Sequence, residues 1–482
     1  MAQDFATTTL QLTQLRIDLR TAEENEIRLR RRLAETQESI CNMRIRAKEL
    51  EEMLKTAYIS RLPHEVISEI FVGVCANIST PPDSVAENLR DIRRSPELVV
   101  SQVSRRWRAV AIGTRSLWAN IRLYSGQSQD LLAMYHERCG QHLLRIQCVH
   151  PLGHEQAEST RISKFIVAAI NQCRSLNVWF PPNTCQFLFP QIRDLRAPFL
   201  QELTLVDRHF GVSQLPLFTK GLPSLLSAEL QGVDPTSLQS PSGLSLVRSL
   251  NLSQTTLRDM EAAAFVGFLQ SLPSLSSLTL DGDPVNFQNG STPFDVITLP
   301  SLQSLHIITC FSDSLYAMTS NFRTPSLKHL TIDWTRADYP GHRSDWVLEF
   351  RANVAAFSPW NRQIESLAVY DNFQSYGDIL LGLSLVFPNI TRLTLSSNAD
   401  RAMEELMVRH FREKGGEESW SSWEKLKTLV LNDSAFSRDI LLNLLRSRKS
   451  SGCPIGKVIF PGSTRAEWGS HSVNCSVCAV TS

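Results

Sequence analysis

Residues 275–280 read Leu-Ser-Ser-Leu-Thr-Leu, and residues 302–307 read Leu-Gln-Ser-Leu-His-Ile. Both stretches place apolar side chains at their first, fourth and sixth positions. The pattern has clear copies beginning at Leu200, Val247, Leu275, Leu302, Leu327, Ile364, Ile390 and Leu426, and weaker copies at Cys173 and Leu225. Successive copies start 22 to 37 residues apart, so the chain carries an internal repeat.

The period and the apolar positions are those of the leucine-rich repeat. Each copy predicts one short strand whose alternate residues enter a shared core, followed by a helical or irregular return, as in Thr255–Leu272 and Asp439–Arg446. One copy cannot bury its own apolar face, so the copies are expected to stack. The solvent-facing strand positions are expected to form one row: Thr204, Asn251, Thr279, His306, Thr331 and Thr394. Insertions rich in Trp follow residues 332 and 395. They are the other candidate surface for a target; the alternative is that their aromatic side chains cap the underside of the array.

The first 57 residues have a different pattern. Residues 10–57 contain no Gly and no Pro, and with Leu12 at heptad position a, twelve of the fourteen a and d positions are apolar. This repeat predicts a coiled-coil helix. The hypothesis is self-association into a parallel dimer; the alternatives are a helix folded back on its own chain and a frayed single helix. Glu26 occupies an a position, where a buried charge weakens the seam.

Residues 58–125 predict a small helical unit. Pro63 suits a first helical turn, and apolar residues from Leu62 to Val74 follow at helical spacing. A second helix is expected after Ser95-Pro96, with Leu117 and Trp118 further on. About 40 ordered residues bury little surface, so this many apolar side chains indicates a partner that completes the core.

The segment Leu62-Pro63-His64-Glu65-Val66-Ile67 with Ile70-Phe71 resembles the first helix of the F-box family, and Val103-Ser104-Arg105-Arg106-Trp107 with Leu117-Trp118 resembles its later part. The match covers about 60 residues. Ser104 replaces the usual Cys, and the span between Phe71 and Leu98 is longer than the family norm, as in fungal members. The resemblance implies docking of a Skp-type linker subunit and, through it, a cullin–RING ubiquitin ligase. The residues it implies for partner binding are Leu62, Pro63, Val66, Ile67, Ile70, Phe71, Leu98, Val99, Val103, Trp107 and Trp118.

Composition and motifs exclude several function classes. Lys+Arg is 49 and Asp+Glu is 48, which argues against a nucleic-acid or acidic-membrane binder. No secretory signal, membrane span, phosphate loop, dinucleotide fingerprint, metalloprotease motif or nucleophile elbow is found. No cofactor and no metal are expected: Cys453, His471, Cys475 and Cys478 lack the spacing of a standard zinc finger. Ten scattered cysteines favour a reducing compartment, cytoplasmic or nuclear.

The predicted fold class is an α + α/β solenoid. The predicted order is a coiled-coil helix (1–57), an F-box (58–125), a connecting segment (126–165), an irregular leucine-rich-repeat array (166–462) and a tail (463–482). The predicted function is a non-enzymatic substrate-recognition subunit of an SCF-type ubiquitin ligase, in which the repeats bind a protein target. The alternative is a non-catalytic repeat scaffold with no link to ubiquitin transfer.

Overall fold

The chain divides into two compact units. The computed structural model describes residues 2–77, 95–124, 126–149, 156–180, 185–207, 216–238, 244–253, 262–282, 296–308, 321–333, 363–370, 380, 383–384, 386–396, 423–432 and 438–460. Unit 1 comprises residues 1–80 and 96–114, and unit 2 comprises residues 81–95 and 115–482.

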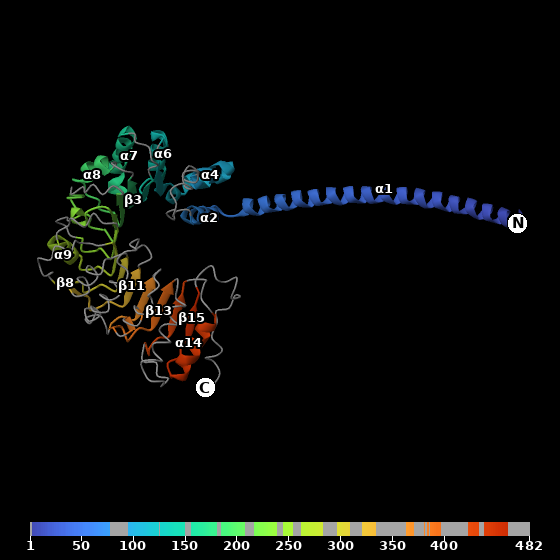
Figure 1. The fold of residues 1–482 in the computed structure, drawn as a ribbon. Coiled ribbons are helices and arrows are strands. Elements are labelled where there is room, and N and C mark those ends of the chain that lie inside the picture. Colours follow the sequence, from blue (N-terminus) through green and yellow to red (C-terminus); the bar gives the residue numbers. More distant parts are fainter. Residues whose placement is uncertain are drawn as a thin grey trace. The chain divides into compact units, whose positions relative to one another are not determined.

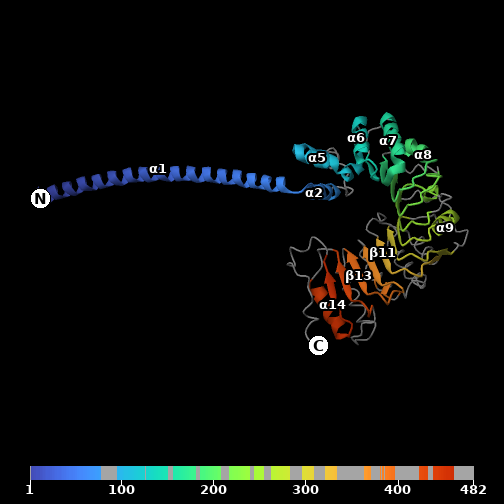
Figure 2. The same cartoon turned by 180° about the vertical axis from the view of Figure 1, so that it is seen from behind.

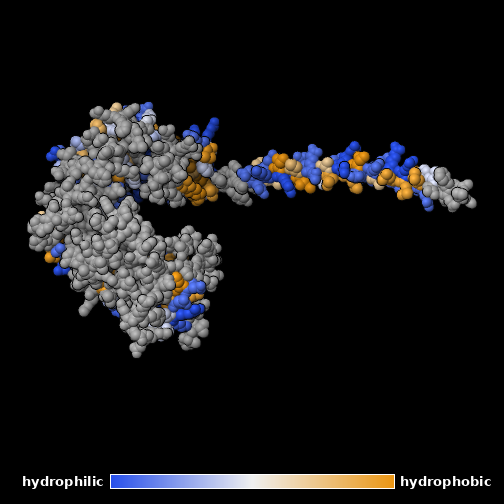
Figure 3. Space-filling model, viewed as in Figure 1, coloured by the Kyte–Doolittle hydropathy of each residue, from blue (hydrophilic) through white to orange (hydrophobic). Residues whose placement is uncertain are grey.

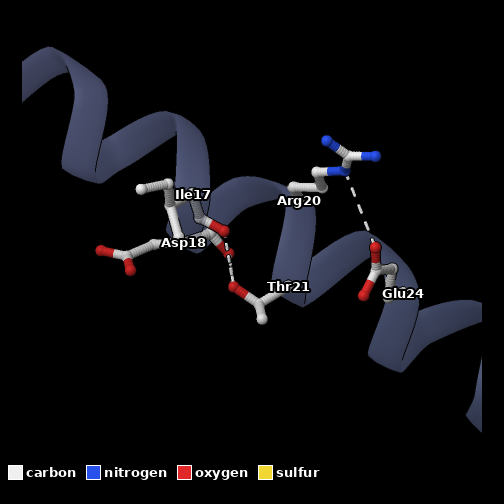
Figure 4. A network of polar contacts seen from close by, with 5 residues as sticks. All are labelled: Ile17, Asp18, Arg20, Thr21 and Glu24. Atoms are coloured by element: carbon white, nitrogen blue, oxygen red, sulfur yellow. Dashed lines mark hydrogen bonds and ion pairs between the residues drawn. The ribbon is translucent and has the colours of Figure 1, made fainter.

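Unit 1 opens with the long helix α1 (Ala2–Arg61) (Figure 1). The uninterrupted helix agrees with the absence of Gly and Pro from residues 10–57. Polar side chains also bond along the helix itself: Thr21 Oγ1 donates to the carbonyl of Ile17 at 2.6 Å, and Arg20 lies 3.7 Å from Glu24 (Figure 4).

The rest of unit 1 consists of three short helices, α2 (His64–Asn77), α4 (Pro96–Val103) and α5 (Arg105–Gly113). Pro96 begins α4 because a first-turn proline lacks only an amide that would be unpaired there. Ser104 caps α5, its hydroxyl accepting the amide of Trp107 at 3.1 Å. The three helices contact one another and form a small core.

Unit 2 is built on a repeat-like parallel sheet of 13 strands among the described residues, with nearly sequential strand order (Figures 1 and 2). Its strands are β1 (Asn120–Leu123), β2 (Leu144–Val149), β3 (Cys173–Phe180), β4 (Glu202–Asp207), β5 (Ser227–Gln231), β6 (Ser249–Ser253), β7 (Ser277–Asp281), β9 (Ser304–Ile308), β11 (His329–Asp333), β12 (Ser366–Tyr370), β13 (Arg392–Ser396), β14 (Thr428–Leu431) and β15 (Lys457–Ile459). The short strands β8 (Ile297–Thr298) and β10 (Phe322–Arg323) pair separately.

The register aligns equivalent positions of neighbouring copies. Leu278 of β7 lies between Leu250 and Leu305, and Leu280 lies between Leu252 and Ile307. All six side chains are buried, so two continuous apolar columns form the core of the stack. The strands predicted at all ten copies are confirmed, including the weaker ones that become β3 and β5.

The returns between strands carry the helices α6 (Gln129–Cys139), α7 (Gln156–Ala169), α8 (Cys185–Ile192), α9 (Ala262–Gln270) and α14 (Arg438–Ser450) and the 3-10 turns η1 (Arg115–Ala119), η2 (Ile170–Gln172) and η3 (Pro235–Leu238). The helix predicted at Asp439–Arg446 is confirmed by α14. Of the helix predicted at Thr255–Leu272, residues 255–261 lie outside the described part, and α9 covers most of the remainder.

The sheet starts earlier than the repeat pattern does. Sequence analysis places the array from residue 166, whereas β1 and β2 already pair in parallel with each other and then with β3. The buried side chains of these two strands are Ile121 and Leu123 of β1 and Leu144, Ile146 and Cys148 of β2, so both strands contribute to the same core. Most of the predicted insertions after residues 332 and 395 (residues 334–362 and 397–422) and the tail 463–482 lie outside the described residues. Trp423, near the end of the second insertion, is described and is buried.

Arg448 stabilises the C-terminal end of unit 2. Its side chain is only 1% exposed, and its guanidinium donates to the carbonyls of Trp423 at 2.8 Å and Cys453 at 3.1 Å. Burial lowers the pKa of this guanidinium from its usual value. The side chain therefore ties α14 to the segments that enter β14 and β15.

Candidate functional site

Helix α2 presents two apolar rows with opposite environments. Ile67, Phe71 and Cys75, spaced four residues apart, are buried. Val66, Ile70 and Val74, spaced in the same way, are exposed. Since residues four apart lie on one helix face, α2 packs one apolar row inside unit 1 and leaves a second one uncovered.

The buried row holds the three helices together. The ring of Phe71 lies 4.9 Å from that of Trp107 on α5, tilted by 59°. Val100 of α4 and Val110 and Ala111 of α5 are also buried. The core residues therefore come from all three helices. Removing any one helix would expose apolar side chains of the other two.

Polar contacts fix the helix ends around this core. The Thr114 hydroxyl donates to the carbonyl of Val110 at 2.8 Å, so the Ser68 hydroxyl, 2.8 Å from Thr114 Oγ1, acts as the donor in that pair. Arg106 donates to the carbonyl of Leu62, and Arg108 donates to that of Ser101 at 3.0 Å. These bonds tie the N-terminal end of α2 and the end of α4 to α5.

Exposed apolar side chains also occur on the neighbouring helices. Val99 and Val103, four residues apart on α4, are 52% and 59% exposed, and Ile112 of α5 is 42% exposed. Figure 3 shows hydrophobic surface gathered over the α2 and α4 region of unit 1. We call the exposed set, Val66, Ile70, Val74, Val99, Val103 and Ile112, the apolar patch. A patch of this kind on a small helical unit is typical of a protein interface.

The structure sorts the sequence-predicted site residues into three groups. The patch contains Val66, Ile70, Val99 and Val103; Pro63 is exposed as well, and Leu62, Leu98 and Trp107 are half-buried. Ile67 and Phe71 belong to the core of unit 1. Val74 and Ile112 were not among the predicted partner-binding residues, although the spacing of Val66 and Ile70 extends directly to Val74.

Trp118 lies apart from the other predicted residues. It belongs to unit 2, where it is fully buried. Its ring meets Tyr135 of α6 edge-on at 5.4 Å, and the Arg138 guanidinium lies 4.3 Å from its centroid. Its side chain thus packs at the start of the sheet, as a core residue of unit 2.

The strand positions that alternate with the core columns form a second row, of polar character. The register aligns Thr204, Glu229, Asn251, Thr279, His306, Thr331, Ala368 and Thr394, so the predicted positions do line up and Glu229 and Ala368 join them. The expected exposure is wrong for Thr394, which is buried, and the other members are half-buried. Glu229 accepts hydrogen bonds from Thr204 and Asn251, each at 3.3 Å. This row offers hydrogen-bonding groups and little apolar area.

The described residues show no metal cluster among their His, Cys, Asp and Glu side chains. Three members of the zinc candidate, His471, Cys475 and Cys478, lie outside the described part. Cys41, Cys75, Cys139, Cys148, Cys173 and Cys453 are not disulfide-bonded. Burial raises the pKa of Cys139 and raises that of Cys173 to about 12, which disfavours the reactive thiolate at both. No described helix has the length and apolarity needed to cross a bilayer.

The fold and these surfaces define a protein with a long N-terminal helix, a small helical unit that bears an apolar patch, and a repeat-like parallel sheet. No family model and no curated protein matches the chain. Among solved structures, the crystal structure of the Rad7 and Elc1 complex in yeast matches with 16% identity, 84% of this chain covered, 95% of that chain covered and a TM-score of 0.35. A likeness of this size assigns no function.

Proposed function

We propose that the chain is the substrate-recognition subunit of an SCF-type cullin–RING ubiquitin ligase. In this proposal the unit formed by α2, α4 and α5 is an F-box that docks a Skp-type linker subunit, and the sheet of unit 2 is a leucine-rich-repeat array that binds a protein target. The chain performs no chemistry itself. Other subunits transfer ubiquitin to a target that the chain holds nearby.

The apolar patch carries the proposal. Val66, Ile70 and Val74 are exposed although the same helix buries Ile67, Phe71 and Cys75 in its own core. Uncovered apolar surface is unfavourable in water, so a partner that covers the patch gains binding free energy from it. The resemblance of residues 62–71 and 103–107 to the F-box names a Skp-type subunit as that partner.

The test is binding of a purified Skp-type linker to the full chain with the double substitution Val66→Glu and Ile70→Glu. Both side chains are exposed, so the folded unit tolerates the charges, whereas burying two carboxylates in an interface is strongly unfavourable. We expect loss of measurable binding by calorimetry and an unchanged melting temperature. Glu65→Gln is the matched control, because it changes a solvent-facing charge elsewhere on α2 and should bind like the unmodified chain.

Full-strength binding by the double variant would overturn docking through this face. A linker that fails to bind even the unmodified chain would favour the alternative, a repeat scaffold with no link to ubiquitin transfer. Co-precipitation of a cullin from cells separates the two functions independently, because a scaffold has no cullin to bring down.

A further inference from the structure

The apolar seam of α1 is uncovered along its whole described length. Every side chain from Thr9 to Met53 is exposed, including the seam residues Leu12, Leu15, Leu19, Leu29, Leu33, Ile40, Met43 and Leu50. The contacts drawn in Figure 4 involve Ile17, Asp18, Arg20, Thr21 and Glu24, all outside the a and d positions. They leave the seam open for a second helix.

A parallel, in-register pairing of two copies is disfavoured by charge. It would bring Glu26 at position a against Glu26 of the second copy inside the seam. It would also place Asp18 at position g beside Glu23 at position e of the second copy, a second like-charge contact. Only Arg46 with Glu51 forms an attractive g–e pair.

An antiparallel pairing removes these conflicts in one register. With Leu33 opposite Thr36 of the second copy, the seam layers match in size: Leu19 with Leu50, Ala22 with Ala47, and Leu29 with Ile40. Glu26 then lies against Met43 instead of another carboxylate. Its own ion pair with Arg30, at 2.5 Å on the same helix, offsets part of its charge.

The flanking charges select this register. In antiparallel helices e positions face e positions, so Arg16 meets Glu51 and Glu23 meets Arg44, each twice by symmetry. No like-charge pair arises at the nearest e or g contacts. A shift of one heptad in one direction sets Arg16 against Arg44, and a shift in the other sets Glu23 against Glu51.

We propose that α1 is a dimerisation helix that pairs antiparallel with α1 of a second copy of this chain, in the register that places Leu33 opposite Thr36. The parallel orientation expected from the heptads alone is replaced by one that the charges favour. Ile17, Ile27 and Ile45 lie at b and f positions and remain exposed in the pair. The inference does not depend on the proposed ligase function.

Charge reversal tests both the pairing and its direction in the full chain, by sedimentation equilibrium at low salt. Arg16→Glu sets two like-charge pairs in place of two attractive ones, and we expect a dimer dissociation constant raised roughly tenfold. Adding Glu51→Arg to the same chain restores opposite charges in the antiparallel pair and should recover the original constant. In a parallel dimer position 16 would face the uncharged Gln11, so Arg16→Glu alone would change the constant little, and adding Glu51→Arg would weaken pairing by setting the new arginine against Arg46. Glu38→Arg, at an outward f position, is the control and should leave the constant unchanged.

Cysteine cross-linking gives a second readout of orientation. In a Cys41→Ser background, the single variants Leu19→Cys and Leu50→Cys are oxidised separately and as a mixture, each compared with the Cys41→Ser parent. Only the mixture should give a new covalent dimer, since Leu19 faces Leu50 of the second copy. A covalent dimer from Leu19→Cys alone would overturn the antiparallel arrangement, and a chain that stays monomeric at every concentration measured would overturn the dimer.

Discussion

Ile70 and Phe71 are neighbours on α2 that should respond in opposite ways to truncation. Phe71 is 1% exposed and packs against Trp107, whereas Ile70 is 46% exposed on the apolar patch. Phe71→Ala removes a core ring and should cost about 3–5 kcal/mol of folding free energy. That is a large part of the stability that such a small unit can have.

Ile70→Ala changes little in the free protein, within about 0.5 kcal/mol, because its side chain is already half in water. Its effect should appear on binding. Complete burial of an isoleucine is worth about 1.5–3 kcal/mol, and the exposed half of Ile70 leaves roughly 1 kcal/mol to gain. A loss of that much binding free energy raises the dissociation constant for a Skp-type linker about fivefold.

The two substitutions are compared by thermal unfolding followed by circular dichroism and by titration calorimetry with the linker. We expect Phe71→Ala to lower the unfolding temperature of unit 1, and Ile70→Ala to leave it in place while weakening binding. The reverse pattern, with a destabilised Ile70→Ala and a stable Phe71→Ala, would refute the assignment of the two rows of α2.

Other predictions concern unit 2. Arg448→Met keeps the apolar stem but leaves the carbonyls of Trp423 and Cys453 without this donor, and should cost about 2–4 kcal/mol in denaturant unfolding. Gly232→Ala should cost at least about 1–3 kcal/mol in the same assay, because φ is +69° there and the new Cβ would collide with the carbonyl of Asp207. Cys173 should resist iodoacetamide at pH 8 while exposed Cys41 reacts, as mass spectrometry of the native protein would detect. Because burial raises the pKa of Cys173 from 9.0 to about 12, its thiol favours the folded state below pH 9 and loses that contribution as pH rises towards 12.

Much of unit 2 was predictable because its repeat is local. Apolar residues recur in every copy at the positions of Leu275, Leu278 and Leu280, and a stack with parallel strands brings those positions into register. The polar row that includes Thr279 and His306 follows from the same alternation of side chains. Both features depend on short-range spacing, which can be read directly from the sequence.

The functional surface of unit 1 was predictable only in part. Val66, Ile67, Ile70 and Phe71 are all apolar, so their spacing predicts one wide face, whereas the structure buries two of them and exposes the other two. That division depends on where α4 and α5 pack, which is a long-range property. Trp118 is a similar case, because only the position of α6 makes it a core residue of unit 2.

The direction of α1 pairing bears on what dimerisation does for the proposed receptor. In a parallel dimer the two C-terminal ends of α1 would lie side by side, about 10 Å apart. In the antiparallel register the same ends lie roughly 80 Å apart, from the rise of 1.5 Å per residue. Under the proposed function, each copy would then have room to dock its own linker. A gain in affinity from two linked copies requires a target whose sites span a comparable distance, because effective concentration falls to near zero when the link cannot reach. Short monovalent targets should therefore bind Arg16→Glu as tightly as the unmodified chain, when both are compared at a concentration where only the unmodified chain is dimeric. Equal loss of affinity for short targets and for extended multivalent targets would contradict this expectation.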